Sequence, residues 1–254
     1  MKTVHTSAVC VVIPTYNERE NLQNLVEVLL EVFEANGIIG YVLIVDDNSP
    51  DGTGQLADEM AAKNKNIHVI HRTGKLGLGS AYKEGFSMAI EKLGSDLVFE
   101  MDADLSHDPR FIPKFIAKVN EGFDVVVGSR KVEEGGVVGW GFYRKLVSGV
   151  GNALARWLCG IKVHDATSGY RAFTREALRT IDCSTLRSEG YAFQIETLFR
   201  SERMGLKVAE IPIVFVDRKV GKSKLGVKDW SRFSLTCVRL LLERIVSLYR
   251  GRVS

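Results

Sequence analysis

Ala8-Val-Cys-Val-Val-Ile13 opens the stretch of sequence that decides the fold, and Tyr41-Val-Leu-Ile-Val45 closes it. Both are short, continuous apolar runs, as expected of strands that are buried on both faces of a sheet. Between them, apolar residues recur at helical spacing as far as Asn36-Gly37, which predicts a helix. A strand, a helix and a second strand in this order predict a βαβ unit with parallel strands.

The same alternation continues along the chain. Further strands are predicted near 67–71, 96–101, 124–127 and 208–216. Further helices are predicted near 53–63, 80–93, 109–120, 139–158, 191–204 and 228–249. We therefore expect an α/β fold with a Rossmann-like, mostly parallel sheet that is flanked by helices.

Composition excludes several classes of protein. The chain has 254 residues, of which 45% are apolar and 26% are charged, so it is neither disordered nor collagen-like. It contains no run of 18 uncharged apolar residues, and we expect no transmembrane domain and no signal peptide. The four cysteines form no Cys-x-x-Cys pair, which favours buried, reduced thiols and a cytoplasmic location.

The net charge of +3 hides an asymmetry, because the first half of the chain is acidic and the second half is basic. An acidic half is suited to a metal ion, and a basic half to phosphate or an anionic membrane surface. Charges that simply lie on solvated faces would give the same balance. Net charge alone therefore does not decide between these alternatives.

The strongest local signal is Phe99-Glu-Met-Asp102-Ala-Asp104, where a buried strand ends in an Asp-x-Asp pair. In an extended chain Asp102 and Asp104 point to the same side, so both carboxylates can bind one hard cation. Mg²⁺ or Mn²⁺ suits a site with few carboxylates and a substrate diphosphate. The alternative is a pair of surface aspartates at a turn.

Polar residues also follow the first two predicted strands. Pro14-Thr-Tyr-Asn-Glu18 follows the first and Asp46-Asp47 the second, at the edge where open α/β sheets bind ligands. Carboxylates there can accept hydrogen bonds from ribose hydroxyls, and Tyr16 can stack on a base. Helix capping is the structural alternative for Glu18.

Six short motifs occur in order along the chain. They are Val12-Ile-Pro14-Thr-Tyr-Asn-Glu18, Val45-Asp-Asp-Asn-Ser-Pro-Asp-Gly-Thr53, Lys75-Leu-Gly-Leu-Gly79, Met101-Asp-Ala-Asp-Leu-Ser-His107, Gly128-Ser-Arg130 and Phe215-Val-Asp-Arg218. Together they resemble dolichol-phosphate mannose synthases and related polyprenyl-phosphate glycosyltransferases, which belong to inverting glycosyltransferase family 2 with the GT-A fold. This resemblance covers nearly the whole chain. It implies a single GT-A catalytic domain over 1–230 and a C-terminal amphipathic helix over 231–254.

The resemblance also implies a role for each matching residue. The nucleotide sugar would be bound by Pro14, Tyr16, Glu18, Val45, Asp47, Asp102, Ala103, Asp104, Arg218 and Lys224. The acceptor phosphate would be bound by Arg130, Arg144 and Ser148, and the metal by Asp102, Asp104 and Ser106. Asp104 and Arg130 are the implied catalytic residues. We expect His107, beside the aspartates, to pack in the turn rather than to bind metal.

The implied reaction moves mannose from GDP-mannose to dolichyl or polyprenyl phosphate with inversion. Three alternatives stay open: another donor such as UDP-glucose, a nucleotidyltransferase, or a nucleotide-sugar-binding protein without catalysis. An ionised lipid phosphate can attack the sugar without a side-chain base, because its second pKa is about 6. The planar guanidinium groups of Arg130 and Arg144 are suited to bidentate phosphate binding.

Two predicted helices have aromatic and aliphatic residues interleaved with basic ones. The first includes Trp140, Phe142 and Trp157, and the second lies between Phe233 and Tyr249. Basic amphipathic helices of this kind bind membrane surfaces, although packing against the protein core would explain the pattern equally. We expect a peripheral protein on the cytosolic face of a membrane, with a membrane-anchoring subunit as a possible partner and no nucleic-acid partner.

Overall fold

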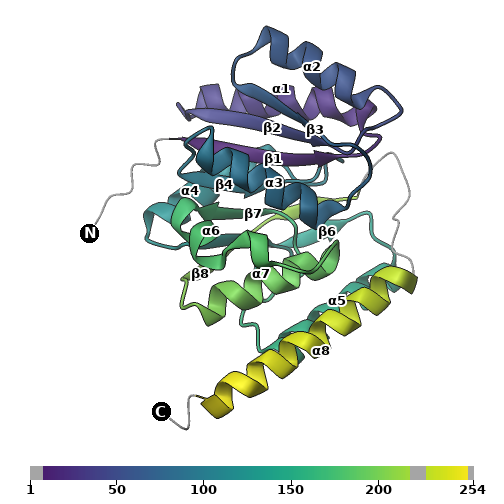
Figure 1. Cartoon of the computed structure of the whole chain (residues 1–254), viewed down its shortest axis with the longest axis vertical. Helices are drawn as coiled ribbons and strands as arrows, with labels where there is room; N and C mark the ends of the chain where they lie inside the picture. The colour runs from purple at the N-terminus through teal and green to yellow at the C-terminus, as the bar shows by residue number, and fades with distance from the viewer. Residues whose placement is uncertain (1–7, 218–226, 251–254) are drawn as a thin grey trace.

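The computed structural model describes residues 8–217 and 227–250 (Figure 1). A seven-stranded sheet has the strand order β3-β2-β1-β4-β7-β5-β8. These strands are β1 (Val9–Thr15), β2 (Gly40–Asp46), β3 (Ile67–His71), β4 (Leu97–Glu100), β5 (Val125–Ser129), β7 (Arg171–Thr174) and β8 (Val208–Pro212). In this sheet β7 is antiparallel to β4 and β5, and the other neighbouring pairs are parallel.

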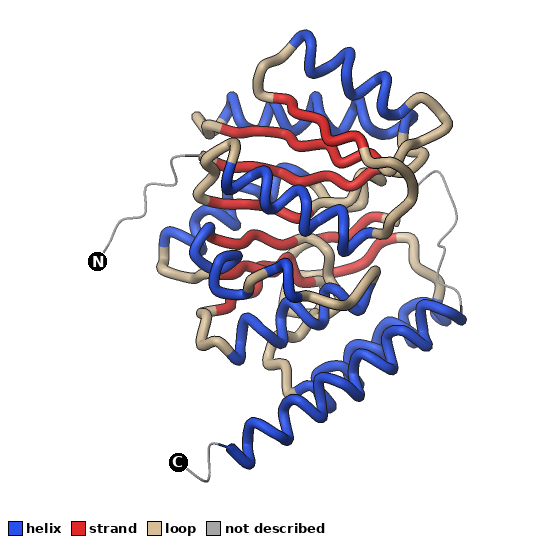
Figure 2. The backbone as a smooth tube through the Cα atoms, viewed as in Figure 1, coloured by secondary structure: helices blue, strands red, loops and turns tan. Residues whose placement is uncertain are grey.

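Helices cover both faces of the sheet (Figure 2). One face packs against α1 (Arg19–Ala35), α2 (Thr53–Lys63) and α4 (Ile112–Asn120). The other packs against α3 (Leu78–Glu91), α6 (Arg175–Ile181) and the start of α7 (Tyr191–Arg203). This arrangement confirms the predicted α/β fold.

The first strand shows why its residues form a doubly covered sheet. Val9, Val11 and Ile13 are buried among α1, α2 and α4, whereas Cys10 and Val12 are buried on the opposite face. Successive side chains of a strand point to opposite faces, so an uninterrupted apolar run fills both cores at once.

The chain departs from the predicted elements after β5. The predicted strand over 208–216 is two strands, because β8 ends at Pro212 and β9 (Val214–Val216) pairs instead with β6 (Gly136–Val138). Strands β6 and β7 and helix α6 were not predicted, since each is short and has no clear periodicity. A 3-10 turn, Pro109–Phe111, precedes α4, and another, Cys183–Thr185, precedes α7.

Two long helices, α5 (Phe142–Cys159) and α8 (Val227–Arg250), lie side by side at one end of the molecule (Figure 1). Cys159 and Cys237 are buried between them with Phe233 and Leu240. Among the described residues, no helix combines the length and apolar character that a membrane span requires.

A buried arginine on β7 joins the sheet to the segments around it. The side chain of Arg171 is fully buried, and its guanidinium donates hydrogen bonds to the carbonyl oxygens of Ala166, Ser168 and Gln194 at 2.7–2.9 Å. Arg171 is the register partner of Glu100 on β4, which is also fully buried. The loop over 166–169 and the N-terminal part of α7 are therefore held at the end of β4 by one side chain.

Burial raises the pKa of Glu100 to about 7, although the positive charge of Arg171 opposes this rise. The folded protein therefore binds a proton at Glu100 more tightly than the unfolded chain does. This contribution to stability is present below the unfolded pKa, near 4.5, and is lost as the pH rises through about 7.

We predict that Glu100→Gln removes this pH dependence. Relative to the variant, the wild-type protein should lose roughly 1–3 kcal/mol of unfolding free energy between pH 5 and pH 8. Urea unfolding at the two pH values measures the difference. Glu31→Gln, at an exposed position on α1, is the matched control. The prediction would be contradicted if the unfolding free energies of wild type and Glu100→Gln differed by the same amount at pH 5 and at pH 8.

Candidate active site

A pocket of about 230 Å³ lies where β4 and β5 end. Its lining includes Asp102 and Asp104 after β4, Arg130 after β5, and Arg144 and Ser148 on α5. Parallel strands have their carboxyl ends at one edge of a sheet, which is where this fold class binds ligands. Two of the three residues predicted to bind metal, Asp102 and Asp104, thus lie in one pocket with those predicted to bind the acceptor phosphate, whereas Ser106 is buried and does not line it.

The turn after β4 holds its two aspartates in fixed positions. The backbone N–H of Asp102 donates to Nδ1 of His107 at 3.1 Å. Oδ1 of Asp104 accepts hydrogen bonds from the backbone N–H of Ser106 at 3.1 Å and from its hydroxyl at 2.5 Å. Leu105, between Asp104 and Ser106, has a φ of +62°, a left-handed conformation that closes the turn.

His107 packs within the turn, in agreement with the preferred interpretation. It is buried, and its ring stacks on Tyr170 with 5.1 Å between ring centroids. Burial lowers the pKa of His107 to about 4, so the imidazole is neutral at physiological pH. A neutral ring is compatible with Nδ1 accepting the hydrogen bond from Asp102.

The donor set in the pocket fits a hard divalent cation that is also bound by substrate. Asp102 and Asp104 supply carboxylate oxygens, and the Asp102 side chain is 41% exposed. Across the described chain, no group of three or more His, Cys, Asp and Glu side chains is placed to hold a metal. Mg²⁺ and Mn²⁺ commonly complete such a site with water and substrate phosphates. The Ser106 hydroxyl is engaged by Asp104, so its predicted role as a ligand stays a prediction.

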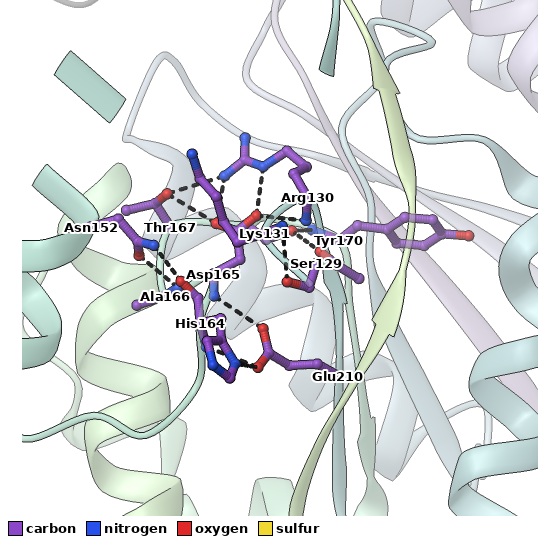
Figure 3. Close-up of polar contacts among 12 residues, drawn as sticks. Ser129, Arg130, Lys131, Asn152, His164, Asp165, Ala166, Thr167, Tyr170 and Glu210 are labelled. Carbon is purple, nitrogen blue, oxygen red and sulfur yellow. Dashed lines mark hydrogen bonds and ion pairs between the residues drawn. The ribbon is translucent and has the colours of Figure 1, made fainter. Parts of the chain in front are cut away.

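Arg130 is held by a buried carboxylate that the sequence did not identify as its partner (Figure 3). Asp165 accepts hydrogen bonds from the backbone N–H, Nε and Nη2 of Arg130 at 2.7–2.9 Å. Burial alone would raise the pKa of Asp165, but the hydrogen bonds and charge of Arg130 lower it. Glu210 on β8 accepts a hydrogen bond from the backbone N–H of Asp165, which fixes the position of Asp165 relative to the sheet.

Arg144 forms a different kind of ion pair. Its Nη1 donates to both carboxylate oxygens of Asp217 at 2.8 Å, and the two side chains are 24% and 26% exposed. Its guanidinium also lies over the ring of Trp140, 4.2 Å from the centroid. The guanidinium of Arg130 also lies over this ring, 5.4 Å from the centroid, so both arginines contact Trp140. Trp140 thus lines the pocket, and its predicted contact with a membrane surface stays a prediction.

The residues predicted to bind the nucleoside lie at the ends of β1 and β2, outside the lining of the pocket. The side chain of Val45 is fully buried in the core, which leaves only its backbone for a ligand. Glu18 occupies the N-cap position of α1 without a capping side-chain hydrogen bond. Ala103 lies buried between the two aspartates, and Pro14 is partly buried.

Asp47 connects this region to the glycine-rich loop before α3. Its carboxylate pairs with Arg72 at 2.5 Å and accepts the backbone N–H groups of Leu76 and Gly77. In the same loop, the ammonium group of Lys75 lies 4.1 Å from the centroid of the Tyr16 ring. Asp47 therefore orders the loop over 72–77 beside Tyr16.

Sequence reasoning missed Arg72, Asp165 and Asp217 as functional candidates, and it considered Trp140 only as a residue of a membrane-binding helix. Arg72 follows β3 at the same edge as the other polar residues, so the strand-end rule identifies it. Asp217 lies within one of the quoted motifs. Arg218 and Lys224, predicted to bind the diphosphate, lie outside the described residues.

Known structures share the fold of this chain. Mannosyl-3-phosphoglycerate synthase from Rubrobacter xylanophilus has a TM-score of 0.66 at 23% identity, with 96% of this chain and 75% of that one covered. Glucosyl-3-phosphoglycerate synthase from Mycobacterium tuberculosis, solved with Mn²⁺, UDP and glucosyl-3-phosphoglycerate, has a TM-score of 0.63 at 20% identity, over 94% and 80% of the two chains. The architecture is the GT-A fold.

Closer relatives are found among characterised sequences. Polyprenol monophosphomannose synthase of Mycolicibacterium smegmatis is 45% identical over 222 residues, which are 87% of this chain and 82% of the relative. Undecaprenyl-phosphate mannosyltransferase of Micrococcus luteus is 43% identical over 218 residues, 86% and 87% of the two chains. The family model described as glycosyl transferase family 2 matches residues 10–182. The chain is a glycosyltransferase that belongs to glycosyltransferase family 2.

Proposed function

We propose that this chain transfers mannose from GDP-mannose to the phosphate of a polyprenyl or dolichyl lipid, with inversion at the sugar carbon. The observation that carries the proposal is the single pocket that contains Asp102 and Asp104 together with Arg130 and Arg144. Carboxylates for a cation and guanidinium groups for a phosphate are the two requirements of this reaction. The names of the two relatives support a polyprenyl phosphate as acceptor and mannose as the sugar.

The acceptor phosphate is the nucleophile. It is largely ionised at neutral pH, so no side chain has to remove a proton from it. One phosphate oxygen forms a bond to the anomeric carbon while the bond from that carbon to the donor diphosphate breaks. GDP leaves with the electron pair, and attack from the opposite side inverts the configuration.

The residues of the pocket orient the two anionic groups. Arg144 and Ser148 on α5 bind the acceptor phosphate, and Arg130 lines the pocket beside them. Asp102 and Asp104 would hold Mg²⁺ or Mn²⁺, with Ser106 as a further ligand. When bound, such an ion neutralises charge that develops on the leaving diphosphate. Mn²⁺ and UDP are present in one structural neighbour, which supports this assignment.

The nucleoside is assigned to the region beside the pocket. Tyr16 offers a ring for stacking, and Pro14, Glu18, Val45 and Asp47 surround the same strand ends. Ala103 lies between Asp102 and Asp104 in the turn after β4, and we assign it to the nucleotide-sugar site with them. Arg218 and Lys224 complete the proposed diphosphate site.

Helices α5 and α8 offer a membrane-facing surface. Large apolar side chains are exposed along one side of each helix, and we call them the apolar stripe: Phe142, Leu146, Val150, Leu154 and Trp157 on α5, and Leu235, Val238, Leu242, Ile245 and Val246 on α8. Phe142 is 83% exposed and Trp157 76%. Because a polyprenyl chain stays in the bilayer, a pocket beside an apolar surface suits a peripheral protein on the cytosolic face.

A donor and acceptor panel tests the proposed reaction directly. The purified protein is supplied with GDP-mannose or UDP-glucose and a short polyprenyl phosphate; both products are identified by mass spectrometry, and the anomeric configuration of the lipid product by NMR spectroscopy. We expect mannosyl phosphoprenol with the inverted anomer, together with GDP. Transfer only from UDP-glucose would reassign the donor. Release of no sugar from any donor would instead favour a nucleotide-sugar-binding protein.

We predict that Asp104→Asn lowers the transfer rate on the order of 100-fold or more, because it removes a charged ligand from the pocket. Calorimetric titration of Mn²⁺ in the presence of GDP should show weakened metal binding. The matched control is Asp108→Asn, which alters an aspartate of the same turn that does not line the pocket. Undiminished transfer by Asp104→Asn in excess chelator would contradict the metal assignment.

We predict that Phe142→Glu combined with Trp157→Glu weakens binding to vesicles on the order of 100-fold, since each large apolar side chain loses a favourable transfer to the membrane. Vesicle sedimentation measures this, and transfer to a short soluble acceptor should be unchanged. Ile39→Glu, at an exposed apolar position outside α5 and α8, is the control. Unchanged sedimentation of the double variant would assign the stripe to an anchoring subunit instead.

A further inference from the structure

Both pocket arginines are paired with carboxylates, but the two pairs differ in how firmly they are held. The side chains of Arg130 and Asp165 are 8% and 0% exposed, and three nitrogens of Arg130 donate to Asp165. Releasing Asp165 would leave a fully buried carboxylate without its cation, which is strongly unfavourable. This pair is a fixed part of the structure.

The Arg144–Asp217 pair can exchange. About a quarter of each side chain is exposed, and a single nitrogen of Arg144 donates to both oxygens of Asp217. The Asp217 carboxylate is partly open to solvent, whereas the Asp165 carboxylate is fully buried. Because this pair is partly open to solvent and Arg144 lines the pocket, a phosphate in the pocket can compete with the carboxylate for the guanidinium.

Each member of this pair is held in place by contacts that do not involve the other. The guanidinium of Arg144 lies over the ring of Trp140, a contact in which Asp217 takes no part. The backbone N–H of Asp217 donates to the carbonyl oxygen of Val138 at 3.0 Å, which continues the pairing of β6 with β9. A rotation of the Asp217 side chain can therefore release Arg144 without a movement of either backbone.

The carboxylate of Asp217 has the chemistry of a phosphate group, with negatively charged oxygens that accept hydrogen bonds from Nη1 of Arg144. A phosphate monoester carries about −1.5 to −2 charges at pH 7 and has three acceptor oxygens. It is therefore the stronger ligand for this guanidinium. Because Arg144 and Ser148 line the same pocket, such a group would reach Arg144 from the pocket side.

We propose that Asp217 occupies the place of the acceptor phosphate on Arg144 and is displaced when a phosphorylated acceptor binds. The inference rests on the proposed function, in which Arg144 binds that phosphate. Asp217 keeps Arg144 paired and correctly oriented in the empty pocket, and it competes with any phosphate ligand there. It weakens binding of the acceptor and of the phosphodiester product by the same factor, which favours release of the product.

The substitution Asp217→Asn tests the sign of this effect. A competing carboxylate is removed, so the Kd for farnesyl phosphate, measured by calorimetry on the full chain, should fall about 5-fold. The KM for this acceptor should fall by a similar factor, without an increase in kcat, because competition in the empty pocket affects binding alone. Farnesol, which lacks the phosphate, should show no change.

Two further variants sharpen the comparison. Asp217→Glu keeps the carboxylate and should stay closer to wild type than Asp217→Asn does. Asp165→Asn makes the same chemical change in the fixed pair and should weaken acceptor binding, because it leaves Arg130 buried without its partner. Thermal unfolding of each variant establishes that it is folded.

The outcomes separate this inference from the function on which it rests. If wild type binds farnesyl phosphate and Asp217→Asn binds it equally or more weakly, Asp217 is a structural support for Arg144 and the inference is wrong. If neither protein binds farnesyl phosphate, the phosphate site itself is wrong and the inference falls with it. Tighter binding by Asp217→Asn, abolished by adding Arg144→Ala, supports both.

Discussion

The candidate site depends on one buried cation, the guanidinium of Arg171. An unpaired charge in a protein interior is costly, so a fully buried arginine requires several acceptors in fixed positions. Arg171 finds them in the carbonyl oxygens of Ala166, Ser168 and Gln194, and burial lowers its pKa to about 10. These contacts fix the loop that carries Asp165 and Thr167, and this loop in turn holds Arg130 in the pocket.

Much of the fold and half of the site follow from local sequence. Continuous apolar runs predicted β1 and β2 because a strand buried on both faces has no polar side to interrupt it. The position of Asp102 and Asp104 followed from the same logic, since polar residues at the end of a parallel strand lie at the ligand-binding edge. Each of these inferences depends only on residues that are neighbours in the sequence, so the sequence of this chain was sufficient to predict them.

The parts that escaped prediction depend on partners far away in the sequence. Arg130 pairs with Asp165 and Arg144 with Asp217, and neither spacing has a periodicity that a sequence could show. Strand β7 is short and antiparallel within a parallel sheet, so the alternating pattern gave no signal for it. The family resemblance implied that Arg130 and Arg144 bind phosphate, but it did not show that each already forms an ion pair with a carboxylate.

Partners that are distant in the sequence also change the interpretation of α8. Its arginines first suggested a basic surface for anionic lipid, yet Arg239 pairs with buried Glu196 on α7 at 2.8 Å. Arg244 donates to the carbonyl oxygens of Trp157 and Leu158 at the C-terminal end of α5, where cations are favoured. These two charges fasten α8 to α7 and α5 and leave the apolar stripe on the exposed side. Attachment through this surface would therefore depend on buried apolar area more than on charge, with the arginines determining which side of the helix is presented.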